Sequence, residues 1–238
     1  MSTTPAGVVV DGRTLEFPIR VRDASSWAAV FTVPAEAAQR LVEPSGLHVV
    51  RTLPGRTAVT LVFADYRDGD LDAYHEFGVS FLVHPHDGAS RLDLVRNRAG
   101  VYIHWLPVNE TFTMQAGRSI WGYPKTLADI DIRTQGELTT CELGVDGRMQ
   151  VRLSVASRGR VPMPRQSPPT YTFLDGVLRR TEWEVEGRSH AARRGSVEMG
   201  TGEIADELRA LGLPKKPLLV LSQPEFRVRF GPAEVVRA

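Results

Sequence analysis

Hydrophobic and polar positions alternate with a period of two along most of the chain, which is the pattern of strands that bury one face. These segments are rich in β-branched and aromatic residues and are separated by Gly, Asp or Pro. So many strands, with few helical segments between them, predict a mainly β fold, either a sandwich or a closed barrel. The predicted strands are residues 27–33, 47–53, 57–66, 74–83, 101–106, 130–133, 139–144, 148–155, 176–185 and 225–230.

Helical periodicity is confined to three short segments, residues 35–42, 110–120 and 203–211. Pro34 suits a first helical position, and Asn109 and Thr201 are expected to cap the second and third helices. The proline-rich run 161–170 is predicted to be a stiff loop, because strands of the same type lie on both sides of it. We therefore expect residues 1–238 to form a single domain.

Composition narrows the class of protein. The 238 residues are 42% hydrophobic, which is enough for a sizeable core. The 29 basic and 28 acidic residues give a net charge of +1, too small a field to favour nucleic acid or an anionic membrane as a partner. No apolar run has the length of a membrane span, and the first residues lack the pattern of a signal peptide. We expect a cytoplasmic protein.

The single cysteine, Cys141, excludes an internal disulfide and a cysteine-based metal site. Because it lies in an alternating segment, we interpret it as a small core residue. His84 and His86 stand two apart near a strand end, where they could share a face as metal ligands, but the surrounding residues favour a turn. His104, in an apolar strand, is predicted to be a satisfied core histidine, with a place in a pocket as the alternative. Neither a glycine-rich phosphate loop nor a Gly-x-Ser-x-Gly turn occurs in the sequence.

The segment 116–130, with the sequence AGRSIWGYPKTLADI, carries the clearest chemistry. Its short helix is expected to end at Gly122, and Pro124 prevents continuation. Lys125 is then predicted to begin a strand among aromatic and aliphatic neighbours. Removal from water disfavours the ammonium form, and the neutral amine is the form that attacks a carbonyl. The alternative is a lysine that points to water, and the residues alone leave both interpretations open.

The predicted strand 74–83 has two distinct faces. Phe77, Val79, Phe81 and Val83 share one face, which is predicted to be core. Tyr74 and Glu76 lie on the other face, which either lines a pocket or faces water. For a glutamate water is the commoner environment.

Two motifs resemble the acetoacetate decarboxylase family. The run Gly117-Arg118 followed by Gly122-Tyr123-Pro124-Lys125 is similar to the family's Gly-Arg-Glu…Tyr-Pro-Lys signature, and Tyr74-His75-Glu76 resembles its Tyr-x-Glu. The resemblance implies a closed antiparallel barrel with a few short helices, self-association and no cofactor. It also implies that the lysine forms a Schiff base with a small keto acid and that the glutamate is an acid or base.

Four further residues are candidate substrate contacts, namely Arg118, Tyr74, Trp121 and Tyr123. Trp121 and Tyr123 are expected to form an apolar wall. Arg118 either binds a carboxylate or pairs within the helix turn.

The sequence also departs from the family pattern. In acetoacetate decarboxylase, the well-known example of such a site, desolvation or a cationic neighbour activates the lysine. Thr126 replaces the second lysine here, so activation of Lys125 has to depend on burial, and Ser119 replaces the signature glutamate. Leu61 aligns with a further acidic position. The carboxylate-binding arginine falls near Ala24, with Arg22 or Arg20 as possible replacements.

These departures leave three functions open. The first is decarboxylation of a β-keto or α-keto acid through a lysine imine. The second uses the same imine as an enamine in aldol addition or dehydration. The third is a β-barrel protein that binds a ligand without chemistry.

Overall fold

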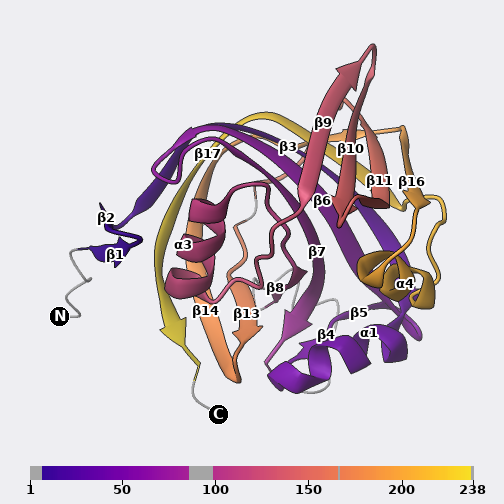
Figure 1. Ribbon diagram of the computed structural model, residues 1–238. Coiled ribbons are helices and arrows are strands. Elements are labelled where there is room, and N and C mark those ends of the chain that lie inside the picture. The colour runs from indigo at the N-terminus through magenta and orange to yellow at the C-terminus, as the bar shows by residue number, and fades with distance from the viewer. Residues whose placement is uncertain (1–6, 86–98, 166, 237–238) are drawn as a thin grey trace.

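A closed barrel of seven strands forms the body of the protein in the computed structural model, which describes residues 7–85, 99–165 and 167–236 (Figure 1). Neighbouring strands are antiparallel except β8 and β13, which run parallel. The mainly β closed barrel predicted from the sequence is therefore confirmed. In barrel order the strands are β3 (Ile19–Pro34), β6 (Arg56–Gly69), β7 (Tyr74–His84), β8 (Gly100–Trp105), β13 (Thr170–Leu174), β14 (Val177–Gly187) and β17 (Leu219–Val235), which pairs again with β3.

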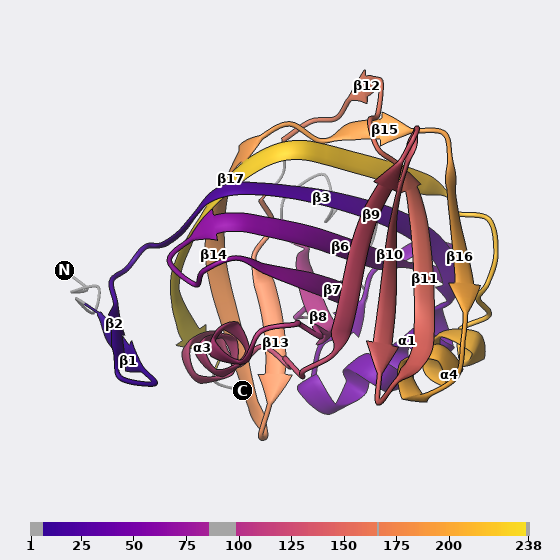
Figure 2. The same ribbon diagram turned by 45° about the horizontal axis from the view of Figure 1, so that its top comes forward.

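A second, four-stranded antiparallel sheet packs beside the barrel (Figure 2). Its inner residues share the main hydrophobic core with the barrel strands and with two of the helices. The sheet order is β16 (Gly195–Met199), β11 (Arg148–Ala156), β10 (Leu138–Val145) and β9 (Asp129–Gln135).

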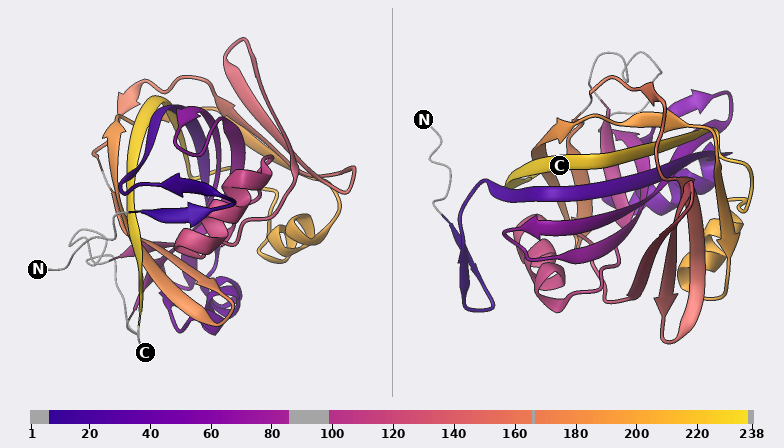
Figure 3. Two further views of the ribbon diagram at one scale, coloured as in Figure 1. Left: turned by 60° about the vertical axis from the view of Figure 1, so that its left-hand side comes forward. Right: turned by 90° about the horizontal axis from the view of Figure 1, so that it is seen from above.

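Short strands complete the fold. The hairpin of β1 (Val8–Val10) and β2 (Arg13–Leu15) extends from the barrel beside helix α3 (Figure 3). The predicted strand 47–53 is two pieces, β4 (His48–Val49) and β5 (Arg51–Leu53), and the predicted loop 161–170 contains β12 (Val161–Pro162), which pairs with β15 (His190–Ala192).

The hydrophobic core confirms the predicted face of β7. Phe77, Val79, Phe81 and Val83 are at most 1% exposed and pack in the main core. Full burial of one such side chain stabilises the fold by about 1.5–3 kcal/mol. Cys141 is fully buried in the same core, as predicted.

The three predicted helices are present as α1 (Ala35–Val42), α3 (Thr111–Trp121) and α4 (Glu203–Ala210), and a 3-10 turn, Glu43–Ser45, follows the first. Their predicted caps are wrong. The positions before α3 and α4 are Glu110 and Gly202, and neither makes a side-chain cap. Asn109 Oδ1 accepts from the backbone N–H of His75 instead, at 2.7 Å, so that it ties α3 to β7. Within the described ranges, no helix has the length and apolar character needed to cross a membrane.

Candidate active site

Lys125 lies in the loop between α3 and β9 and does not begin a strand, contrary to the sequence-based prediction. Gly122 ends the helix in the left-handed region, at φ 63°, as predicted for a glycine at this position. The N–H of Tyr123 then bonds to the carbonyl of Gly117 at 3.0 Å. Arg118 Nη1 donates to the carbonyl oxygen of Lys125 at 3.1 Å. The loop is thus folded back against its own helix, and the lysine backbone is held in place.

The Lys125 side chain is only 3% exposed. Its Nζ lies 2.9 Å from Glu76 Oε2 and donates to Thr113 Oγ1 at 3.1 Å. It also lies 4.8 Å from the centre of the Tyr74 ring, a distance at which a cation and an aromatic face attract. The Glu76 carboxylate is thus in direct contact with the amine, with no group between them.

Gly117 leaves room for the Lys125 side chain to lie against α3. A methyl group added to Gly117 would lie 2.6 Å from Cδ and 2.8 Å from Cε of Lys125. Both distances are shorter than ordinary van der Waals contact. A glycine therefore fits at this position of the Gly-Arg motif, because a Cβ atom would overlap with the Lys125 side chain.

We expect Gly117→Ala to move the amine away from Glu76 and to lower turnover by about 100-fold, the loss that a displacement of about 1 Å produces in an active site. Turnover and the melting temperature of the variant would be measured together. Ser119→Ala, a change at an exposed position of the same helix that also raises helix propensity, is the control. Wild-type turnover in Gly117→Ala would show that the close approach has no catalytic role.

Glu76 lies on β7 with its side chain turned toward Lys125. The hydroxyl of Tyr66 donates to Glu76 Oε1 at 3.2 Å, so each carboxylate oxygen has its own partner. Tyr66 and Tyr74 are stacked with ring centres 4.4 Å apart. Burial and the charge of Glu76 raise the pKa of both phenols well above the usual range. Both tyrosines therefore keep their protons at neutral pH.

Sequence reasoning missed Tyr66 and Thr113. Tyr66 faces Tyr74 directly across the β6–β7 pair, and this register could have been counted from the turn between the two strands. Thr113 lies twelve residues before Lys125 in sequence, and only the return of the loop along α3 brings the two side chains together. Among the predicted residues, Lys125, Glu76 and Tyr74 come into direct contact.

The other three predicted substrate contacts lie around the end of α3. Trp121 is 2% exposed, and its Nε1 donates to the carbonyl of Gly231 at 2.8 Å. The Tyr123 hydroxyl is 3.3 Å from Thr170 Oγ1, and its ring packs against that of Trp121. Arg118 contacts the backbone of Lys125, which lies beyond the end of the helix.

Within the described residues, the contacts of Nζ do not include the positions where the sequence departs from the family pattern. Leu61 is fully buried in the apolar core and pairs with Val79. Arg22 binds Asp68 at 2.8 Å and Asp70 at 2.5 Å on the outer surface. Thr126 is exposed. Ala24 is buried in a separate apolar cluster, and Arg20 is exposed beside a small groove of about 140 Å³.

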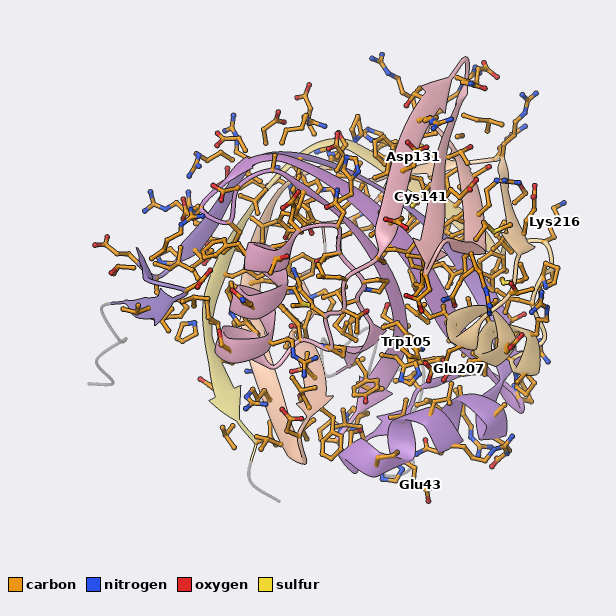
Figure 4. All side chains as sticks on the ribbon, in the orientation of Figure 1. Glu43, Trp105, Asp131, Cys141, Glu207 and Lys216 are labelled. Atoms are coloured by element: carbon orange, nitrogen blue, oxygen red, sulfur yellow. The ribbon has the colours of Figure 1, made fainter. Side chains whose placement is uncertain are left out.

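The competing histidine sites have plain structural outcomes. His104 Nε2 lies 2.9 Å from Glu207 Oε1, so His104 is a satisfied histidine that links β8 to α4. The same oxygen of Glu207 accepts from Trp105 Nε1 at 2.8 Å, and Figure 4 shows the Trp105 and Glu207 side chains near each other. His84 lies at the end of β7, and His86 lies outside the described residues. In the part of the chain that the structure describes, no group of three or more His, Cys, Asp or Glu side chains is arranged to hold a metal.

A separate cavity of about 450 Å³ lies between the second sheet and the loop before α3. Its lining includes Asn109, Asp129, Asp131, Glu142 and Arg148, but neither Lys125 nor Glu76. The chemistry gathered around Nζ therefore does not coincide with this cavity.

Comparison with known proteins gives a consistent picture. Residues 10–231 match the family described as acetoacetate decarboxylase (ADC). No curated protein matches the sequence significantly. Among solved structures, an acetoacetate decarboxylase from Legionella pneumophila subsp. pneumophila str. Philadelphia 1 is similar with a TM-score of 0.75 and 17% identity, over 100% of this chain and 90% of the other.

Two further solved structures share the fold. The enduracididine biosynthesis enzyme MppR complexed with pyruvate has a TM-score of 0.63 and 19% identity, over 93% of this chain and 91% of the other. An acetoacetate decarboxylase-like enzyme from Sphingomonas wittichii RW1 has a TM-score of 0.66 and 14% identity, over 94% of this chain and 95% of the other. At these identities the structural similarity establishes the fold.

Proposed function

Because the chain belongs to the acetoacetate decarboxylase family, we propose that it is a lyase that forms a Schiff base through Lys125 and decarboxylates a small keto acid. The observation that supports this proposal best is the buried amine of Lys125, 3% exposed and 2.9 Å from the Glu76 carboxylate. An amine removed from water beside a proton acceptor is a common arrangement for a lysine that attacks a carbonyl.

The proposed reaction uses the two residues in sequence. Glu76 takes a proton from the ammonium group, and the free amine attacks the substrate carbonyl; loss of water then gives a protonated imine. Cleavage of the bond to the carboxylate releases carbon dioxide, and its electron pair passes to the imine to form an enamine. Glu76, which gave up its first proton in the loss of water and has taken another from solvent, then protonates the enamine carbon. Water hydrolyses the resulting imine and releases the ketone and the lysine.

The second candidate is a Schiff-base aldolase or dehydratase, in which the enamine forms by loss of a proton and attacks an aldehyde. One observation favours it over decarboxylation. Arg22, one of the two predicted replacements for the family's carboxylate-binding arginine beside Arg20, is occupied by Asp68 and Asp70. Both candidates use Lys125 as the electrophilic anchor and Glu76 as the proton carrier. A binding protein without chemistry is the third candidate, and trapping separates it from these two.

Reduction with borohydride in the presence of pyruvate or acetoacetate is expected to add one substrate fragment to Lys125. Peptide mapping by mass spectrometry locates the adduct. Incubation with borohydride alone is the control for background reduction. If neither pyruvate nor acetoacetate gave an adduct, only the binding-protein candidate would remain. Release of carbon dioxide from acetoacetate then separates the decarboxylase from the aldolase.

A further inference from the structure

His75, the residue just before Glu76 on β7, makes hydrogen bonds to two other segments of the chain. Its backbone N–H donates to Asn109 Oδ1 at 2.7 Å, and its carbonyl oxygen accepts from the Asn109 N–H at 3.3 Å. Its ring nitrogen Nδ1 lies 3.2 Å from the carbonyl oxygen of Ile130 on β9. A carbonyl oxygen can only accept, so Nδ1 is the donor. The other ring nitrogen, Nε2, lies 3.4 Å from Asp65 Oδ1.

The segment 107–109 lies between the strand of Glu76 and the segment that follows Lys125. Glu76 forms a β-bridge with Val108, and Val108 forms a second bridge with Leu127. Backbone hydrogen bonds of 2.9 Å join the segment to both of its neighbours. Glu76 and Lys125 are therefore carried by the outer two of three adjacent segments, yet their side chains meet at 2.9 Å.

The hydrogen bond between His75 and Ile130 connects the outer two segments directly. Ile130 lies five residues after Lys125, so the bond limits how far the lysine loop can shift relative to β7. Helix α3 holds the other end of the loop, where the Tyr123 N–H bonds to the carbonyl of Gly117 at 3.0 Å. The backbone of Lys125 is thus held from both sides.

We propose that His75 is a positioning residue, because its hydrogen bond to Ile130 sets the distance between the candidate amine and its carboxylate. This inference rests on the proposed function. Successive side chains of a strand point to opposite faces, so His75 points away from the face on which Glu76 meets the amine. Its pairing with Asp65 on β6, and the contact between their side chains, agree with this direction. A change at His75 therefore alters the geometry of the pair and removes no group that contacts the amine.

A role in stability alone gives a different result. In that case, loss of the bond would lower the melting temperature and leave the rate of each folded molecule unchanged. A positioning role lowers the rate itself, because a displacement of about 1 Å in an active site costs about 100-fold. It leaves KM unchanged, since the side chain of His75 lies on the opposite face of β7 from the amine.

Two amide side chains test the bond separately from the ring. In His75→Asn the side-chain nitrogen takes the place of Nδ1 and still donates to the Ile130 carbonyl. In His75→Gln the amide reaches the place of Nε2, so it keeps the contact with Asp65 and loses the bond to Ile130. We would measure kcat and KM for exchange of the pyruvate methyl protons with deuterated water, the extent of the borohydride adduct at Lys125, and the melting temperature.

We expect His75→Gln to lower kcat by about 10- to 100-fold, up to the loss for a displacement of about 1 Å, with KM and the extent of the adduct unchanged. His75→Asn, the conservative variant, should recover most of that loss. Asp65→Asn is the matched control, because it removes the carboxylate beside Nε2 and leaves the bond to Ile130. Its kcat should equal that of the wild type.

The outcomes separate the two proposals. Equal kcat values in His75→Asn and His75→Gln, at the wild-type value or below it, would overturn the positioning role, while an adduct at Lys125 would still support the Schiff base. A wild-type protein that forms no adduct would overturn the proposed function, and the positioning role with it. If His75→Gln does not fold, His75→Thr takes its place, because threonine suits a strand and is too short to reach Ile130.

Discussion

Lys125→Met is expected to abolish both the borohydride adduct and turnover, since no other amine contacts Glu76 among the described residues. Methionine has nearly the length of lysine and fills the same channel beside Gly117, so loss of activity would not be caused by a cavity. A persistent adduct in this variant would show that another lysine reacts, and the assignment of Lys125 would be wrong.

The same variant carries a prediction for stability. Removal of one partner of a buried ion pair leaves the other charge uncompensated, which typically costs about 3–5 kcal/mol. We expect Lys125→Met to lower the free energy of unfolding by an amount within or somewhat below that range, because Glu76 keeps its hydrogen bond from Tyr66. Lys125→Met/Glu76→Gln should recover much of the loss, since it contains no unpaired charge. Urea denaturation of the wild type and both variants measures the difference.

Glu76→Gln is expected to lower turnover by about 100- to 10,000-fold, the usual contribution of a general acid or base. The amide still accepts the Tyr66 hydrogen bond but cannot carry a proton. The variant leaves Lys125 itself in place, so we expect the adduct at Lys125 to persist. The decisive measurement is exchange of the pyruvate methyl protons with deuterated water, which requires proton transfer at carbon.

Glu142→Gln, a change on the exposed side of the second sheet, is the control for loss of a carboxylate. Its methyl exchange should equal that of the wild type. If Glu76→Gln exchanged protons and turned over at the wild-type rate, its role as proton carrier would be refuted.

Local pattern predicted much of the fold. The alternation of Phe77, Val79, Phe81 and Val83 defines a buried strand face wherever the strand is placed, so this prediction held. The helix 35–42 was predicted with its correct bounds because Pro34 marks its start. The predicted caps failed because Asn109 bonds to His75 on β7, and because the N–H of Ile204 at the start of α4 bonds to the side chain of Gln150 on β11. Local pattern does not contain such bonds between distant segments.

Only those residues of the candidate site that belong to a sequence motif could be predicted from the sequence. Lys125, Glu76 and Tyr74 were found through their resemblance to a family, and the structure places them in contact. Tyr66 was not found, because it is selected by the register between β6 and β7. Leu61 was paired with a family acid by counting residues, yet it lies in the apolar core. Counting residues from a family motif does not show which side chains of a strand face the core.

The pairing of β3 with β17 joins residues about two hundred positions apart. Pairings between such distant segments are slow to form, because the chain must first lose the entropy of a long loop. During synthesis β3 and β6 emerge long before their last partner, so β3 presents an unpaired edge of the kind that favours aggregation. Among the described residues, the side chains that contact Nζ belong to the first 125 residues, yet the barrel that holds them cannot close until β17 has left the ribosome.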